Sequence, residues 1–151
     1  MKVAIASDHG GIDLKEDIKA IFASDETFKD IELVDFGTNS TASMDYPDSG
    51  FPAGDAVAAG DCERGILVCG SGIGMSIVAN KVKGIRGALC HSVQFAELSR
   101  LHNNANIIIL PGRFISKYLA KDMLKTWFTT DYEGGRHQNR LDKITKYEEG
   151  E

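Results

Sequence analysis

The stretch LVCGSGIGMS at residues 67–76 has the residue types to do chemistry, because Cys69 stands directly before a glycine-rich turn. Glycine lets a backbone approach a ligand closely, and N–H groups that point outward at the start of a helix favour an anion. Such a turn can hold a phosphate, or an oxyanion that develops during a reaction. A thiol in that field tends toward a lowered pKa, so Cys69 can act as a nucleophile or as a base. The structural alternative is a tight turn beside a small buried cysteine.

The same turn does not fit a nucleotide-binding fingerprint. A dinucleotide loop follows the first strand as G-x-G-x-x-G, with an acidic residue about 20 positions later. Here Gly70, Gly72 and Gly74 are spaced G-x-G-x-G after the third apolar stretch, and the next stretch ends in Cys90 and His91. No G-x-x-x-x-G-K-[ST] motif occurs either. The glycines therefore predict an anion-binding turn without a nucleotide cofactor.

A second group of candidate residues is basic. The segment GGRHQNR at 134–140 sets Arg136 and Arg140 four residues apart, on one face if the segment is helical. Two guanidinium groups in that arrangement suit a phosphate, which accepts bidentate hydrogen bonds. HNNAN at 102–106 adds His102 and Asn103. A solvated helix face and a structural histidine are the alternatives.

Five short apolar stretches must position these residues. They are residues 3–7, 31–36, 65–70, 85–90 and 106–110. Most are continuous apolar runs, as in strands covered on both faces, and helical patterns such as 11–22, 92–102 and 116–129 lie between them. This alternation predicts a five-stranded parallel sheet in a doubly wound, Rossmann/flavodoxin-like α/β/α three-layer sandwich. Residues 37–50 are expected to be a polar loop, with a helix from about Phe51.

Ligands of such a sheet bind outside the carboxyl ends of its strands. The candidate residues at those ends are Asp8 and His9, Cys69 with its glycine turn, and Arg113. We therefore expect the site at this edge.

The composition describes an acidic globular chain. Of its 151 residues, 42% are hydrophobic and 26% are charged, which is ordinary for a single domain, here expected to span residues 1–151. The net charge of −5 argues against a nucleic-acid partner, whereas a pocket with a few arginines still suits an anionic substrate.

The cysteine spacing and the hydropathy indicate the cellular compartment expected for the protein. Three cysteines without CxxC spacing suggest neither a disulfide framework nor a zinc site. No apolar run approaches the ~18–20 residues that cross a bilayer, and the run before Asp8 is too short for a signal peptide. We expect a reduced, cytoplasmic protein that binds neither a metal nor a membrane.

The C-terminal segment predicts an oligomer. Leu141 and Ile144 are spaced for a helix of about residues 134–149, and the residues around them are mostly charged. A terminal helix with so little apolar surface often docks on a neighbouring chain. We therefore expect a homodimer, or a tetramer.

Five segments together resemble one family. They are SDHGG at 7–11, DYPD at 45–48, GILVCGSGIGMSIVANKVKGIRGAL at 65–89, LSRLHNNAN at 98–106 and YEGGRHQNR at 132–140. Over nearly the whole chain they are similar to the type B ribose-5-phosphate isomerases, a family that includes allose-6-phosphate and galactose-6-phosphate isomerases. The resemblance implies interconversion of an aldose 5-phosphate and its ketose through an enediol(ate), in the pentose phosphate pathway and without a metal or organic cofactor.

The resemblance also implies roles. Cys69 would be the base, because the glutamate that serves another branch of the family would stand at Met75. His102 would open the sugar ring, assisted by Asp8. Ser71 and the backbone N–H groups of Gly70, Ser71, Gly72, Ile73 and Gly74 would form the oxyanion hole.

The remaining implied contacts bind substrate. His9, Arg113, Arg136 and Arg140 would hold the phosphate, some of them from a second subunit, so that the active site lies at a subunit interface. Tyr46 and Asn103 would contact sugar hydroxyls. A hexose 6-phosphate isomerase and a non-catalytic sugar-phosphate-binding module remain as alternatives.

Overall fold

The computed structural model of the protein describes residues 1–151 and contains one sheet of five parallel strands. In chain order these are β1 (Lys2–Ser7), β2 (Glu32–Asp35), β3 (Arg64–Cys69), β4 (Gly87–Leu89) and β5 (Ile107–Pro111). Their order across the sheet is β2-β1-β3-β5-β4, and every pair is parallel. The expected five-stranded parallel sheet is therefore confirmed.

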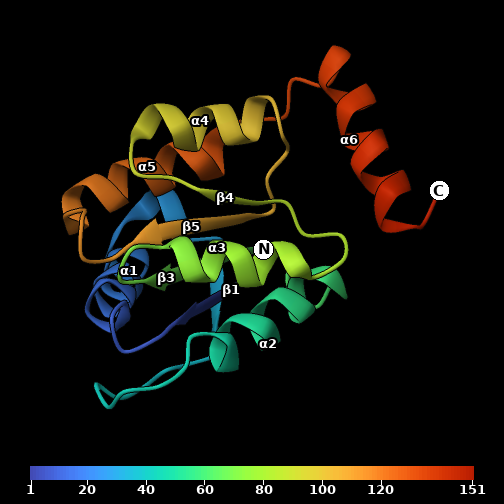
Figure 1. The fold of residues 1–151 in the computed structure, drawn as a ribbon. Coiled ribbons are helices and arrows are strands. Elements are labelled where there is room, and N and C mark those ends of the chain that lie inside the picture. The colour runs from blue at the N-terminus through green and yellow to red at the C-terminus, as the bar shows by residue number, and fades with distance from the viewer.

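Six α-helices and one 3₁₀ turn connect and follow the strands (Figure 1). They are α1 (Ile12–Ser24), the 3₁₀ turn Glu26–Phe28, α2 (Pro47–Ala58), α3 (Ile73–Lys81), α4 (Val93–Leu101), α5 (Lys117–Thr129) and α6 (Arg136–Glu148). Helix α2 begins four residues before the expected start at Phe51, inside the segment expected to be a loop. Pro47 explains this, because a proline is well suited to the first helical position, where its missing N–H has no partner to lose.

The helices form two layers around the sheet. Buried side chains of α1, α4 and α5 pack on one face, where Ile18, Ala96 and Trp127 share a cluster with alternate residues of β1, β3 and β5. Ala53 of α2 and Met75 of α3 pack on the other face with the intervening strand residues. Because both faces are covered, the central strands are apolar throughout rather than alternating. The three-layer, doubly wound architecture is confirmed.

The order of the strands determines the path of the chain across the sheet. The chain leaves β3 through α3, reaches the edge strand β4, and returns through α4 to β5 inside the sheet. This order exchanges the last two strands of the flavodoxin order 2-1-3-4-5. Since all strands are parallel, each of the helices α1 to α5 begins near the carboxyl edge of the sheet and ends near its amino edge.

Helix α6 stands apart from the three layers, at the upper right of Figure 1. Of its apolar residues, Leu141 is buried, whereas Ile144 and Tyr147 are exposed. The expected C-terminal helix is thus present, with most of its surface free of contacts in a single chain. No helix of the protein has both the length and the apolar character that crossing a membrane requires.

Candidate active site

Asp8 and Cys69 lie at the carboxyl ends of the neighbouring strands β1 and β3. The Asp8 N–H donates to the Val68 carbonyl across the two strands, at 3.3 Å. The Asp8 carboxylate is 8% exposed, and its Oδ1 accepts the Gly11 N–H at 3.0 Å. Cys69 is 4% exposed. The carboxylate and the thiol are therefore held at the point where the sheet changes winding direction, the usual ligand site of this architecture.

The glycine turn after Cys69 carries a row of backbone donors without an acceptor in the chain. The N–H groups of Gly70, Ser71, Gly72, Gly74 and Met75 donate to no acceptor of the chain. The N–H of Ile73, which was also expected in the oxyanion hole, instead donates to the Ser71 hydroxyl at 3.2 Å. The turn leads directly into α3, whose N-terminal dipole adds positive potential. This row of N–H groups without acceptors at the start of a helix has the form of an anion-binding nest, and we refer to residues 70–75 as the nest.

Two of these glycines are required by the geometry. Gly72 has a φ of +77°, a backbone conformation that other residues rarely adopt. At Gly74, a β-carbon would come within 2.7 Å of Cζ of Tyr46. The Tyr46 ring therefore covers the start of α3, beside the nest.

Arg113 lies against the same turn. Its N–H donates to the Gly70 carbonyl at 3.0 Å, and the preceding Gly112 N–H donates to the Cys69 carbonyl at 2.8 Å. A β-carbon at Gly70 would lie 3.3 Å from Nη1 of Arg113, and one at Gly10 would lie 3.3 Å from both Nη2 of Arg113 and Oδ1 of Asp8. The guanidinium group thus closes the carboxyl edge beside the nest, where it can pair with an anion.

His9 is oriented by the loop between β2 and α2. Its Nδ1 accepts the Met44 N–H at 3.2 Å, so the neutral ring carries its proton on Nε2 and can donate from that side. At the start of α2, the Ser49 hydroxyl donates to the Ser7 carbonyl at 2.8 Å. These bonds tie the segment that carries Tyr46 to the end of β1.

A buried ion pair anchors the other end of that loop. The Lys15 side chain is fully buried, and its Nζ lies 2.8 Å from Oδ1 of Asp35. Nζ also donates to the Thr38 carbonyl, and Asp35 accepts the Gly37 N–H at 2.9 Å. Lys19 donates to Oδ2 of Asp35 at 2.9 Å. Burial tends to raise the pKa of Asp35, but the two lysines and the Gly37 N–H lower it below its usual value.

The remaining expected residues lie at the opposite edge of the sheet. His102 directly follows α4, and Asn103 follows it before β5 begins, so both belong to the amino edge. The segment before α6 is tied there as well, because the Glu133 N–H donates to the Leu101 carbonyl at 3.1 Å. Arg136 and Arg140, on the first turns of α6, therefore share this edge with His102. One chain divides the expected site into two halves.

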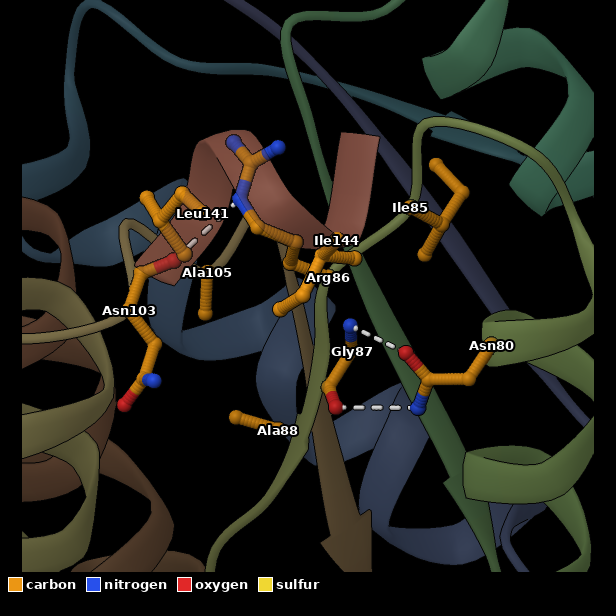
Figure 2. A pocket seen from close by; sticks show the side chains of 9 residues that line it. All are labelled: Asn80, Ile85, Arg86, Gly87, Ala88, Asn103, Ala105, Leu141 and Ile144. Atoms are coloured by element: carbon orange, nitrogen blue, oxygen red, sulfur yellow. Dashed lines mark hydrogen bonds between the residues drawn. The ribbon is translucent and has the colours of Figure 1, made fainter. Parts of the chain in front are cut away.

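A pocket of about 300 Å³ opens at this amino edge, between the sheet and α6 (Figure 2). Leu141 and Ile144 of α6 line it with Asn103. The Asn80 side chain donates to the Gly87 carbonyl and accepts the Gly87 N–H. These two bonds provide partners for backbone groups at the start of edge strand β4. The walls are mainly apolar, and none of the carboxyl-edge residues reaches the pocket.

Two residues outside the expected set surround His102. Its ring stacks on the ring of His137, with centroids 4.4 Å apart and planes inclined by 17°. Glu133 Oε2 lies 3.9 Å from His102 Nε2 and 3.7 Å from His137 Nε2. Burial of His137 and the positive charges of His102, Arg136 and Arg140 lower its pKa, although Glu133 opposes the shift. The sequence analysis of GGRHQNR considered only the two arginines and did not consider His137, which lies between them.

The other cysteines are structural. Cys62 and Cys90 are buried and unpaired. Burial raises the pKa of the Cys90 thiol to about 11 and also raises the pKa of Cys62, aided by Asp61. The raised pKa of each thiol disfavours the thiolate that a reactive cysteine needs, and both residues lie apart from any motif.

Comparison with known proteins identifies the family of the chain. Residues 3–144 match the family model described as Ribose/Galactose Isomerase. A putative sugar phosphate isomerase of Bacillus subtilis, YwlF, is 51% identical over 150 residues, covering 99% of this chain and 98% of the relative.

Two solved structures share the fold and much of the sequence. The ribose-5-phosphate isomerase B of Clostridium thermocellum has a TM-score of 0.94 and 45% identity, with 99% of each chain covered. That of Mycoplasma genitalium with bound ribulose-5-phosphate has a TM-score of 0.91 and 40% identity, covering 99% of this chain and 97% of its own. The matched sequence and the shared fold both extend over nearly the whole chain. The protein therefore belongs to the ribose/galactose isomerase family.

Proposed function

We propose that this protein interconverts D-ribose 5-phosphate and D-ribulose 5-phosphate through an enediol(ate). The observation that carries the proposal is the position of Cys69, which is buried at the end of β3 immediately before five unpaired backbone N–H groups. A base beside a preformed set of anion-stabilising donors suits proton abstraction next to a carbonyl. The bound ribulose-5-phosphate of the Mycoplasma genitalium relative supports the choice of substrate.

The isomerisation moves one proton between carbons, one proton between oxygens and a pair of electrons. The Cys69 thiolate removes the proton from C2 of the open aldose, and the electron pair left behind forms the C1–C2 double bond of the enediolate. Negative charge then develops on the carbonyl oxygen, which the free N–H groups of Gly70, Ser71, Gly72 and Gly74 and the Ser71 hydroxyl stabilise. One such donor contributes about 3–4 kcal/mol to lowering a barrier. Transfer of the C2 hydroxyl proton to the C1 oxygen, together with return of the abstracted proton from Cys69 to C1, gives the ketose.

The other residues bind and prepare the substrate. Asp8 and His102 would open the furanose ring by acid–base catalysis at the ring oxygen and the anomeric hydroxyl. Tyr46 and Asn103 would contact the hydroxyls. His9, Arg113, Arg136 and Arg140 would hold the phosphate. Binding of the phosphate, remote from the reacting carbons, positions C1 and C2 against the thiol.

This set of residues requires two copies of the chain. His102, Asn103 and the two α6 arginines lie at the amino edge, whereas Cys69 lies at the carboxyl edge. We therefore propose a homodimer in which the amino edge of each chain completes the nest of its partner. Exposed apolar residues beside the nest support this arrangement, because a second copy would bury them. They are Ile73 and Ile77 on α3, Phe95 on α4, and Phe114.

A coupled assay on ribose 5-phosphate tests the proposal. Cys69→Ala is expected to abolish isomerisation while the circular dichroism spectrum is retained, and Cys90→Ser serves as the matched control at a buried, structural thiol. Full activity of Cys69→Ala would remove Cys69 from the role of base. Comparison of kcat/KM for ribose 5-phosphate, allose 6-phosphate and galactose 6-phosphate defines the substrate.

A separate measurement distinguishes an enzyme from a binding module. An isomerase exchanges the C2 proton of ribose 5-phosphate with solvent deuterium, which nuclear magnetic resonance detects. Binding of ribose 5-phosphate without this exchange would identify a non-catalytic sugar-phosphate-binding protein instead.

A further inference from the structure

We propose that Arg100 is a positioning residue of the reaction, because its buried guanidinium group holds the turn that directly follows His102. This role rests on the proposed function, in which His102 opens the sugar ring. Arg100 lies in the last turn of α4 and is 5% exposed. Its Cζ lies 5.8 Å from the centroid of the fully buried Trp127 ring, so the side chain points into the core. Arg100 can therefore act on a substrate only through other residues.

The guanidinium group of Arg100 joins the turn after α4 to a distant segment of the chain. Its Nη1 donates to Oδ1 of Asn104 at 2.9 Å and to the Ala105 carbonyl at 2.6 Å. Its Nε donates to the Thr130 carbonyl at 3.4 Å, at the end of α5. Because a guanidinium group is planar and rigid, these bonds fix the turn relative to the segment that leads into α6.

The charge of Arg100 is buried without a carboxylate among its hydrogen-bond acceptors, which are two backbone carbonyls and one side-chain amide. Burial and the positive charges of Arg64 and Arg86 lower the pKa of Arg100 to about 10, although Asp131 opposes the shift. The group is thus still charged at neutral pH. Burial of a charge is costly, and an apolar side chain of similar length would fill the position at lower cost if only packing mattered. The turn that Arg100 binds explains why an arginine stands there.

The turn has a backbone conformation that needs support. Asn104 has a φ of +46° and is the one residue other than glycine with a positive φ. Asparagine tolerates this left-handed region better than most residues, but still at a cost in free energy. The His102 N–H donates to the Leu98 carbonyl at 2.9 Å, so the helical bonds of α4 extend to His102 and the chain reverses just after it. Loss of the turn would therefore free the end of α4 that carries the imidazole.

A second arginine binds the other side of the same turn (Figure 2). Nε of Arg86, just before β4, donates to the carbonyls of Asn103 and Asn104 at 3.2 and 3.1 Å. Its Nη2 also donates to the Asn104 carbonyl, at 3.0 Å. Arg86 lines the open pocket beside α6, whereas Arg100 is buried on the inner side. Arg100 is the better subject for an experiment, because its contacts lie inside one chain.

Arg100→Met tests the role of the guanidinium group, since methionine fills a similar volume without a donor. We expect kcat for ribose 5-phosphate to fall about 10–100-fold, because a displacement of about 1 Å at a reacting group can have that effect. KM should stay within about twofold of the wild type, because the phosphate-binding residues remain. Arg100→Lys, which keeps one donor for the turn, should recover part of the loss.

A second substrate isolates the ring-opening step. The C5 hydroxyl of ribulose 5-phosphate carries the phosphate, so this ketose cannot close a furanose ring. Exchange of its C1 proton with solvent deuterium needs Cys69 and the nest, but does not need ring opening by His102. In Arg100→Met this exchange should stay within about threefold of the wild-type rate.

Arg64→Met is the matched control. Cζ of Arg64 lies 5.2 Å from the centroid of the same Trp127 ring, but its Nη1 donates to the Trp127 carbonyl at 3.2 Å and not to the turn. We expect Arg64→Met to lower stability in urea, as Arg100→Met does, and to leave both the isomerisation and the exchange unchanged.

Two further measurements keep the test valid if Arg100→Met folds poorly or is inactive for another reason. Asn104→Gly removes the Oδ1 that Arg100 binds, and glycine adopts a positive φ without strain. It should lower kcat in the same direction but less, since the Ala105 carbonyl still binds Arg100. Nuclear magnetic resonance of the imidazole signals reports on His102 without substrate. Arg100→Met should shift these signals, because the His102 ring stacks on the His137 ring only when the turn is held.

The outcomes distinguish a positioning role from a structural one. Equal losses of kcat in Arg100→Met and Arg64→Met would overturn the positioning role, as would His102 signals in Arg100→Met identical to those of the wild type. An equal fall of isomerisation and C1 exchange would also overturn it. If the wild-type protein does not isomerise ribose 5-phosphate, the proposed function fails, whereas His102 signals shifted in Arg100→Met and not in Arg64→Met still support the positioning of His102 by Arg100.

Discussion

Cys69 and His102 lie at opposite edges of the same sheet. Cys69 is the last residue of β3, at the carboxyl edge, whereas α4 carries the chain away from that edge before His102 begins the return to β5. A base and an acid so separated cannot act on one small sugar within one chain. Because of this separation, the proposed reaction requires the proposed dimer.

Mixed dimers test this relationship directly. Cys69→Ala and His102→Ala homodimers are each expected to be inactive on ribose 5-phosphate. After the two variants are unfolded and refolded together, about a quarter of the wild-type activity should return, because half of the dimers are mixed and each has one intact site. If both residues acted within one chain, the mixture would stay inactive. Refolded wild-type protein is the control for recovery.

The ion pair of Lys15 and Asp35 is expected to be a large term in stability. Asp35→Asn leaves a fully buried ammonium group with the Thr38 carbonyl but without its charged partner at 2.8 Å. Breaking a buried pair in this way costs about 3–5 kcal/mol, here nearer the lower limit because Asp35 is partly exposed. Urea denaturation measures the change. Lys19→Met, which removes the half-exposed partner of Asp35, should cost less than about 1 kcal/mol.

The same pair predicts how stability depends on pH. The pKa of Asp35 is lower in the folded protein than in the unfolded chain, since the lysines and the Gly37 N–H outweigh the effect of burial. Its contribution is therefore fully present above the unfolded pKa of about 3.9, and is lost as the pH falls through the folded value. The difference in unfolding free energy between wild type and Asp35→Asn should shrink below about pH 4. A constant difference down to acid pH would contradict this assignment.

The contact between Gly74 and Tyr46 predicts a defect in binding geometry. Gly74→Ala places a methyl group within 2.7 Å of the Tyr46 ring, which must move away from the nest. We expect kcat/KM for ribose 5-phosphate to fall about 10–100-fold, since a displacement of about 1 Å at a site can have that effect. Gly54→Ala, a matched substitution in α2 that meets only Val82, is the control. Equal kinetics for the two variants would mean that Tyr46 does not contact substrate.

The amino-acid sequence by itself determined the layers of the fold. Continuous apolar runs such as 65–69 are typical of strands covered on both faces, and the helical spacing of Leu14 and Ile18 predicts a helix that covers one face. The glycine turn after Cys69 could also be predicted from the sequence, because the backbone freedom of glycine does not depend on distant residues. The predicted start of α2 at Phe51 was wrong, because the polar segment before it was taken for a loop and Pro47 was not recognised as the first helical residue.

Only the tertiary structure determines which distant segments of the chain lie side by side. The exchange of β4 and β5 in the sheet depends on how whole elements pack rather than on local pattern. The cluster of His102, Glu133 and His137 arises for the same reason, because it joins the end of α4 to the segment before α6. Local spacing identifies the chemistry that a residue can do, whereas the packing of strands and helices decides which residues can do it together.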